Sequence, residues 1–203
     1  VSSYGGLPKI IDTAEDSFQS VNEALSMAMI DADMVVTSAG VSKGDYDVVK
    51  DVLEKNGEIS LWSVRMRPAK PLAFGVLNSP VGKKIPHLGL PGNPVSAMVA
   101  FIQFGRQAIG IMMGRSPLPN PKLTAILDDP INNFDGRRVY ARVYVYKSDG
   151  GDYRARITGS QSSGVLTSMA VANGLGVCPE DVDRINTGEK IQVEMIDWPE
   201  EIF

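Results

Sequence analysis

The sequence predicts an α/β domain with a covered, mostly parallel sheet, followed by a small all-β domain, either a barrel or a sandwich. Up to Met113, apolar runs with helical spacing alternate with short apolar runs typical of strands. The stretch GRSPLPNP, residues 114–121, then places three prolines within eight residues, which is typical of a stiff linker. Beyond it, apolar and polar residues alternate between turn signals. We therefore expect domains at residues 1–115 and 116–203.

Composition narrows the class of protein. The single cysteine, Cys178, excludes an internal disulfide, and the single histidine, His87, leaves no His/Cys cluster for zinc. A net charge of −4 argues against a general nucleic-acid binder. No stretch has the pattern of a signal peptide. These features fit a cytoplasmic protein that needs neither nucleic acid nor membrane as a partner.

The elements of the first domain follow from periodicity and capping. Asp16 or Ser17 can cap a helix, and Asn56-Gly57 ends a second one. The apolar stretch 95–113 contains two glutamines and an arginine, which favours a core helix over a membrane span. In chain order we expect a helix at 18–29, a strand at 34–37, a helix at 48–55, strands at 59–66, 71–77 and 85–90, and a helix at 95–113.

The second domain shows the two-residue period of strands. Val139, Ala141, Val143 and Val145 would face one side, and the residues between them, including Arg142, would face the other. Cys178 fits a small core residue.

Charge is distributed unevenly along the chain. Residues 1–58 hold eleven acids and four bases, whereas residues 59–127 contain no Asp or Glu. The acid-free stretch is either a basic surface face or a pocket for a polyanion, with acids from the first segment supplying a metal site nearby.

Two strand-to-helix loops are candidate ligand sites. In SAGVSKGDYD, Ser38 and Ser42 can donate to phosphate oxygens, and Gly40 and Gly44 let the backbone approach a ligand. In GLPGNP, helix-start chemistry by itself explains Gly92, Asn93 and Pro94. Many strand-to-helix turns need glycine, so neither loop is specific alone. At one edge of a parallel sheet, however, the two would form a single crevice.

Cations and carboxylates lie near these loops in the sequence. Arg67 and Lys70, in RMRPAKP, could grip phosphate or an oxyanion, or they could be a solvated strand end. Asp16, Asp45 and Asp47 suit a hard cation such as Mg²⁺ bridged to phosphates. Plain helix capping is the alternative for Asp16 and Asp47.

A Ser- and Gly-rich segment lies in the second domain, around ITGSQSSGVL. Arg142, on a neighbouring strand, could help Ser160–Ser163 bind a polar group. A turn-rich segment without a ligand is the alternative.

Taken together, the motifs TSAGVSKGDYD, PAKPLAFG, GLPGNPVSAMVAF and SSGVLTSMAVANGLGVCPE resemble the C-terminal half of the MoeA family, the molybdopterin molybdenumtransferases that include the gephyrin E domain. The resemblance covers nearly the whole chain. It implies a MogA-like three-layer first domain and a MoeA C-terminal β domain. It also implies insertion of molybdenum from molybdate into adenylylated molybdopterin, with Mg²⁺ and release of AMP.

The resemblance also implies residue roles. It makes Asp16 and Asp47 functional acids, and it places Arg67 and Lys70 in a basic loop that contacts anionic ligands. The ligand-edge loops contain Gly40, Ser42, Gly92, Asn93 and Pro94, and the β-domain positions implicated in activity are Arg142 and Ser163.

The chain departs from the family pattern at three places. Ala39 stands where the family usually has glycine, and Ser63 and Arg67 stand where it has lysine; Arg67 keeps the positive charge, whereas Ser63 loses one. The family's Gly-Asp-Glu-Leu segment and two further domains would precede residue 1. They would supply an active-site acid and much of the interface of a homodimer, so we expect the chain to be a fragment.

Two other functions stay open at this point. One is a gephyrin-like scaffold whose β domain captures a peptide. The other is a different nucleotide-processing enzyme on the same sheet, against which the β domain argues.

Overall fold

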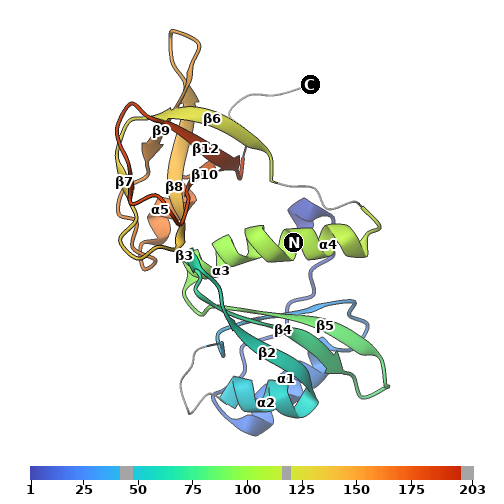
Figure 1. Cartoon of the computed structure of the whole chain (residues 1–203). Helices are drawn as coiled ribbons and strands as arrows, with labels where there is room; N and C mark the ends of the chain where they lie inside the picture. The colour runs from blue at the N-terminus through green and yellow to red at the C-terminus, as the bar shows by residue number, and fades with distance from the viewer. Residues whose placement is uncertain (42–47, 116–119, 198–203) are drawn as a thin grey trace. The chain divides into compact units, whose positions relative to one another are not determined.

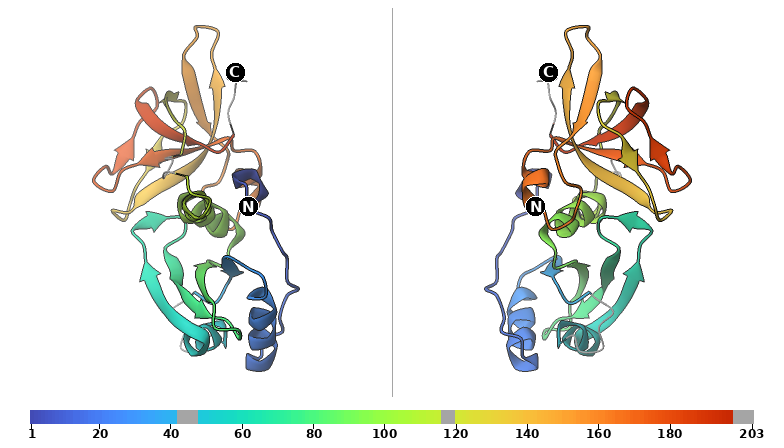
Figure 2. Two further views of the ribbon diagram at one scale, coloured as in Figure 1. Left: turned by 90° about the vertical axis from the view of Figure 1, so that its right-hand side faces the viewer. Right: turned by 90° about the vertical axis from the view of Figure 1, so that its left-hand side faces the viewer.

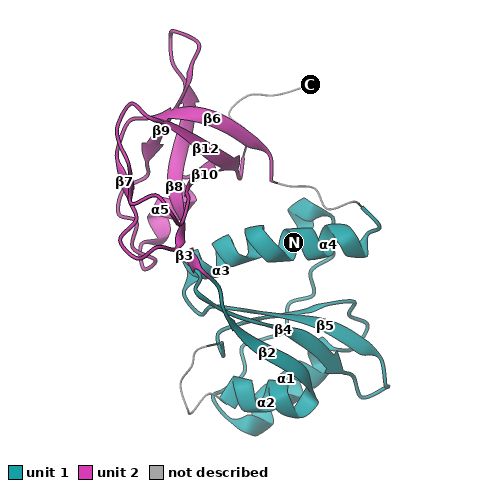
Figure 3. Cartoon of the chain, in the orientation of Figure 1, with its two compact units in different colours: residues 1–64, 69–116 teal, residues 65–68, 117–203 magenta. Residues whose placement is uncertain are grey.

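The computed structural model describes residues 1–41, 48–115 and 120–197. The chain forms two compact units, shown in Figure 3. The first contains residues 1–64 and 69–116, and the second contains residues 65–68 and 117–203. The short segment 65–68 therefore leaves the first unit and contributes to the second before the chain returns.

A four-stranded sheet forms the centre of the first unit (Figure 1). Its order is β1-β5-β4-β2, with bounds β1 Val35–Ser38, β5 Lys84–Leu90, β4 Pro71–Asn78 and β2 Gly57–Ser63. Only β1 and β5 run parallel, and the other two pairs are antiparallel. The expectation of a mostly parallel sheet was wrong. Residues 64–70 connect β2 to β4 and residues 79–83 connect β4 to β5, and both connections are shorter than the crossover of roughly a dozen residues that a parallel pair needs.

Helices pack on both faces of this sheet. On one face, α1 (Phe18–Ala28) and α2 (Val48–Asn56) bury Leu25, Val52 and Leu53 against Leu77 and Ile85 of the strands. Ser17, rather than Asp16, caps α1, since its hydroxyl oxygen accepts the Ser20 N–H at 3.3 Å.

The other face carries one long helix, Pro94–Met112. It consists of α3 (Pro94–Ala100), a π-helical turn η2 (Phe101–Gly105) and α4 (Arg106–Met112). A short 3-10 helix, η1 (Ser2–Tyr4), stacks the Tyr4 ring on Phe101 with 6.1 Å between ring centroids. The predicted helix at 95–113 is confirmed.

By length and composition, Pro94–Met112 is also the one helix among the described residues that could cross a membrane. A core helix of a soluble protein meets the same criterion. Val95, Val99 and Ala100 are fully buried, as expected for a helix that packs on a sheet.

The second unit is a small barrel. Strand β10 (Gly174–Cys178) pairs with both β8 (Arg138–Lys147) and β12 (Lys190–Met195), and this closes a ring through β6 (Lys122–Leu127) and β9 (Tyr153–Ile157). The hairpin β8–β9 projects from it (Figure 2). The smaller elements are β3 (Met66–Arg67), which adds to β8, the pair β7 (Ile131–Asn132) and β11 (Arg184–Ile185), and α5 (Leu166–Ala170).

The barrel interior follows the predicted alternation. Val139, Ala141, Val143 and Val145 all belong to its core, together with Cys178. Arg142 faces the other way, as predicted, yet it is only 1% exposed. The segment 158–168 covers it, as its hydrogen bonds show below.

Candidate functional site

A pocket of about 620 Å³ opens in the first unit where β1 and β5 end. It is lined by four of the predicted site residues, Asp16, Gly40, Gly92 and Asn93. These residues come from three segments far apart in the sequence. The parallel β1–β5 pair is what brings the two loops together at one sheet edge.

The backbone of the two loops is in direct contact. Ser38 and Leu90 are partners at the ends of β1 and β5, and the Ala39 N–H donates to the Leu90 carbonyl at 3.0 Å. A Cβ placed on Gly92 would lie 3.3 Å from the Ala39 Cβ. This contact is tight, so a side chain at 92 would require Ala39 to shift by a few tenths of an ångström.

Asn93 holds the start of the long helix. Its side-chain oxygen accepts the Ser96 N–H at 3.2 Å, and Pro94 occupies the first helical position. Helix-start chemistry thus accounts for the Asn93 side chain, while the residue still lines the pocket.

Asp16 presents a carboxylate to the same pocket. It is exposed, and within the described residues it makes no hydrogen bond or ion pair. Since Ser17 does the capping, the Asp16 carboxylate is left free for a ligand or cation.

The predicted residues Ser42, Gly44, Asp45 and Asp47 lie outside the described residues. Among the residues that are described, no group of three or more His, Cys, Asp or Glu side chains could hold a metal ion. The predicted metal set therefore stays a prediction, with only Asp16 placed.

Two further predicted residues lie beside the pocket in sequence. Ser38 is the exposed last residue of β1. Lys70 is exposed and directly precedes Pro71, which lines the pocket. The Lys70 carbonyl accepts the Val64 N–H at 2.8 Å, so its backbone is fixed while its ammonium is exposed to solvent.

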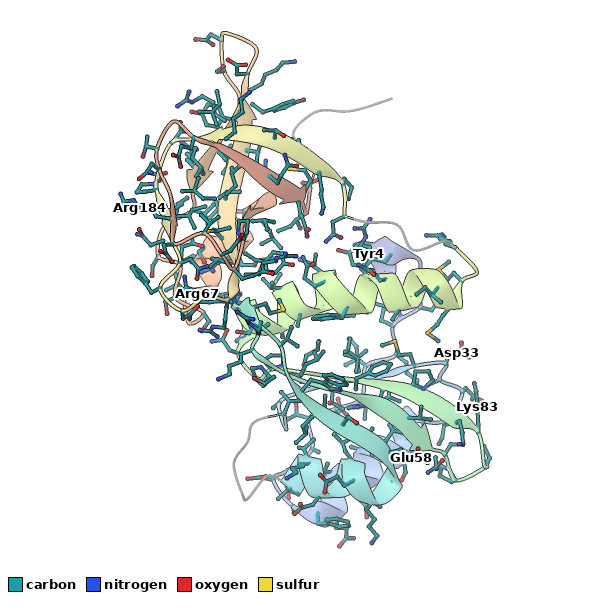
Figure 4. The ribbon with its side chains drawn as sticks, in the orientation of Figure 1. Tyr4, Asp33, Glu58, Arg67, Lys83 and Arg184 are labelled. Carbon is teal, nitrogen blue, oxygen red and sulfur yellow. The ribbon has the colours of Figure 1, made fainter. Side chains whose placement is uncertain are left out.

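Arg67 belongs to the second unit, where it is engaged by its neighbours (Figure 4). Its guanidinium donates to the Asn132 carbonyl at 2.8 Å and lies 3.6 Å from an Asp135 carboxylate oxygen. The neighbouring guanidinium of Arg137 holds the pKa of Asp135 below its usual value, with Arg67 adding to the effect. Arg67 thus helps to fix the loop after β7.

Arg142 organises the Ser-rich loop of the second unit. Its guanidinium donates to Ser168 Oγ at 3.2 Å and to the carbonyls of Ser160 and Ser162 at 3.3 and 3.1 Å. Its backbone N–H donates to the Gln161 side-chain oxygen at 2.8 Å. Burial lowers the pKa of Arg142, and no carboxylate of the described residues forms an ion pair with it.

A buried guanidinium that donates hydrogen bonds to several carbonyls of one loop holds that loop in a single conformation. Ser163 lies within the loop and is half-buried. Arg142 therefore positions the loop that contains Ser163.

Comparison with known proteins agrees with this geometry. Residues 1–110 match the probable molybdopterin binding domain, and residues 124–196 match the MoeA C-terminal region, domain IV. The chain belongs to the MoeA family. The resemblance drawn from the four motifs is confirmed.

Relatives within the MoeA family are substantially longer than this chain. It is 32% identical to a molybdopterin molybdenumtransferase of Haemophilus influenzae over 88% of its own length and 43% of the relative's. For the corresponding protein of a Nostoc species, the figures are 33%, 95% and 44%. The chain thus spans less than half the length of these curated relatives.

The fold also matches a solved member of the MoeA family. The molybdopterin biosynthesis MoeA protein from Pyrococcus horikosii superposes with a TM-score of 0.70 and 28% sequence identity. The match covers 90% of this chain and 42% of that protein.

Sequence reasoning missed the apolar part of the pocket. Val41, Val48 and Val49 line it, together with Pro71 and Ser96. The sequence predicted that Val48 and Val49 lie in a helix. Whether their side chains face the two loops depends on how α2 packs against the sheet. A valine pair at a helix start, directly after a glycine-rich loop, is the signal that could have indicated this wall.

Ala39, where the resemblance predicts a glycine, has a backbone conformation that favours glycine. Its φ of 80° lies in the left-handed region, where a Cβ costs about 1–2 kcal/mol. Ala39→Gly should therefore raise the free energy of unfolding by about 0.5–1 kcal/mol, after the extra chain entropy of glycine is subtracted.

Urea denaturation would measure this gain. Ala32→Gly, at a position outside the left-handed region, is the matched control and should destabilise. Equal losses in both variants would contradict a strained Ala39.

Proposed function

We propose that this chain supplies the molybdopterin-binding and C-terminal parts of a molybdopterin molybdenumtransferase, an enzyme of molybdenum cofactor biosynthesis. The reaction would insert molybdate-derived molybdenum into adenylylated molybdopterin and release AMP. The observation that carries the proposal is the pocket at the ends of β1 and β5, inside the region that matches the molybdopterin-binding domain. We assign residues 1–115 to that domain and 116–203 to the C-terminal β domain.

The pocket has the size and chemistry that such a substrate needs. Its volume of about 620 Å³ lies in the range of small-molecule sites. Backbone amides at Gly40 and Gly92 and at the start of the long helix favour phosphate groups. The valines give an apolar wall for a ring system. Ser38, Ser42, Gly44, Asn93 and Pro94 complete these loops in the proposal.

Magnesium fits the Asp16 carboxylate. The Asp16 carboxylate lines the pocket without a described partner, so both of its oxygens are available to a hard cation. We propose Asp16, Asp45 and Asp47 as its ligands, with Asp16 and Asp47 as the catalytic acids. A bound Mg²⁺ would neutralise charge on the substrate phosphates.

The basic residues take supporting roles in the proposal. Lys70 is free to contact an anionic group, and Arg67 stabilises the loop after β7. Arg142 positions the loop that presents Ser163. We further propose a cytoplasmic enzyme that acts on small molecules, needs no nucleic acid or membrane, and forms a homodimer when the family's other domains are present.

A binding experiment tests the proposal. With adenylylated molybdopterin or AMP plus Mg²⁺ at a hundredfold excess over Kd, the first unit should gain about 2.7 kcal/mol of stability. Asp16→Asn should weaken Mg²⁺-dependent binding at least tenfold, whereas Asp12→Asn, which changes an exposed acid that does not line the pocket, should not. Calorimetric titration measures the affinities of the two variants, and denaturation with and without ligand measures the gain in stability. The proposal would be refuted if binding depended on neither Mg²⁺ nor Asp16, or if the unsubstituted chain did not bind.

A further inference from the structure

The hairpin of β8 and β9, which projects from the barrel of the second unit (Figure 2), has one face made of tyrosine and arginine. Tyr144 of β8 lies opposite Arg156 of β9. Two residues along the strands, Tyr146 lies opposite Arg154. Side chains alternate across a strand, so these four share one face, and the residues between them on each strand belong to the barrel core. We call the outward surface of these four residues the Tyr–Arg face.

One half of the Tyr–Arg face is satisfied by a neighbouring carboxylate. The Tyr146 hydroxyl donates to one oxygen of Asp128 at 2.9 Å, and the Arg154 Nε donates to the other oxygen at 2.7 Å. Arg154 also forms an ion pair with this carboxylate. The charge of Arg154 is thus neutralised within the second unit, and the Tyr146 ring is held in place through its hydroxyl.

Arg156 has a different environment. Its guanidinium carbon lies 5.2 Å from the centre of the Tyr144 ring and 5.9 Å from that of the Tyr146 ring. A cation–π contact of this kind orients the guanidinium but leaves the N–H groups at its edge free to donate. The side chain is exposed, and no residue in the described part of the chain gives it a hydrogen bond or an ion pair. Arg156 is therefore an oriented positive charge without a counter-ion, beside Tyr144, which is 40% exposed.

The backbone on both sides of the hairpin is already hydrogen-bonded next to this face. The Val145 N–H donates to the Asn173 side-chain oxygen at 2.7 Å, and the Asn173 side-chain N–H donates to the Val145 carbonyl at 2.8 Å. On the β9 side, the Ile157 N–H donates to an Asp129 carboxylate oxygen at 3.0 Å. An added strand would find these groups occupied, so a ligand of this face is recognised by side chains rather than by strand addition.

We propose that the Tyr–Arg face binds an acidic peptide segment of a partner protein. One glutamate or aspartate carboxylate of the segment accepts two parallel hydrogen bonds from the edge of the Arg156 guanidinium, the pairing for which a guanidinium is best shaped. An adjacent apolar side chain of the segment packs against Tyr144. Tyrosine and arginine commonly dominate the binding energy of protein interfaces, because they combine rigid contact area with directed hydrogen bonds.

The charge of the face favours a peptide over a nucleic acid. Affinity for nucleic acid comes from several cations that neutralise successive phosphates. The Tyr–Arg face offers one cation without a counter-ion, which suits a single carboxylate, and the net charge of the chain is −4. The pocket at the ends of β1 and β5 is lined by residues of the first unit alone, so this inference is independent of the proposed function.

Peptide titration followed by NMR tests the proposal directly. The probe is the capped tripeptide Glu-Phe-Glu, and its control is Gln-Phe-Gln, which has the same shape without the charge. For a small ligand with one charge-assisted contact we expect a Kd of about 1 mM, with saturating shifts of the backbone amides of the Tyr–Arg face. Gln-Phe-Gln should bind about tenfold more weakly. Amides of the face that do not shift at roughly 10 mM Glu-Phe-Glu, or equal affinity for the two peptides, would overturn the proposal.

A conservative variant separates the shape of the guanidinium from its charge. Arg156→Lys keeps the positive charge but loses the planar pair of donors and the stacking on tyrosine, so the Kd for Glu-Phe-Glu should rise about fivefold. Arg184→Lys is the matched control, since Arg184 is an exposed arginine on β11 outside the face (Figure 4), and it should leave the Kd unchanged. Equal Kd values in the two variants would contradict the assignment of Arg156.

A nucleic-acid titration examines the other class of partner. A single-stranded oligouridylate of about ten nucleotides should leave the amides of the Tyr–Arg face unshifted. If this oligonucleotide bound the face more tightly than Glu-Phe-Glu at the same ionic strength, the occupant would be a nucleic acid and the proposal would be wrong.

Discussion

Replacing Gly40 by alanine should lower the free energy of unfolding of the first unit by about 3 kcal/mol. Two costs add. Gly40 has a φ of 75°, which an alanine adopts only with strain. An added Cβ would also lie 2.3 Å from the Cβ and Cγ1 of Val49, so α2 or the loop would have to move. Because both form the pocket wall, ligand binding should fall as well.

Gly82→Ala separates the two costs. Gly82 has a similar φ, 81°, but no atom lies within 4 Å of the added Cβ. It should lose only about 1 kcal/mol from backbone strain. Urea denaturation followed by circular dichroism at the helical band measures both, since most helical residues of the chain lie in the first unit. Similar losses in the two variants would show that the contact with Val49 is not tight.

Acidification should destabilise the first unit through His87. The side chain is fully buried, its Nε2 lies 3.0 Å from Thr37 Oγ1, and its Nδ1 has no hydrogen-bond partner. Desolvation lowers the pKa of His87 to about 4. Below the usual value of 6.5 the unfolded chain takes up a proton that the folded chain does not, so stability falls as the pH falls. The loss should reach about 3 kcal/mol at pH 4.

The single histidine makes this prediction easy to isolate. His87→Gln removes the titrating group and should flatten the stability profile between pH 6.5 and 4.5, whatever it does to stability at pH 7. The exposed carboxylates are common to both proteins, so their contribution cancels in the comparison. An NMR titration of the one histidine ring reads the folded pKa directly. A value near 6.5, or equal slopes in the two proteins, would contradict the assignment.

Local patterns along the chain predicted most elements of the fold. The alternation at Val139, Ala141, Val143 and Val145 identified the barrel core, because burial on one side of a strand leaves a two-residue period. The spacing of Phe18, Val21 and Leu25 predicted α1 for the corresponding reason in a helix. Gly92-Asn93-Pro94 predicted a helix start, and the Asn93 cap is made.

The candidate site was predictable only in part. Glycine-rich loops after two strands indicated Gly40 and Gly92, and both line the pocket. That Ser17 caps α1, which leaves Asp16 free, depends on which of two adjacent side chains reaches the Ser20 N–H. The role of Arg142 likewise could not be predicted from the sequence. It depends on burial by residues 158–168, and a strand position that faces outward can still be buried by a distant segment.

The sequence by itself determined the helices and strands, the α/β and all-β classes of the two domains, and the membership of the MoeA family. Periodicity, capping and motif order are properties of residues that are close together in the sequence. Only the tertiary structure decided that the sheet is mixed, that the valines of α2 wall the pocket, and that Arg142 is buried behind the Ser-rich loop. These depend on which distant segments meet. Pairing direction and burial are set by connection length and packing across the whole unit, and no local pattern records them.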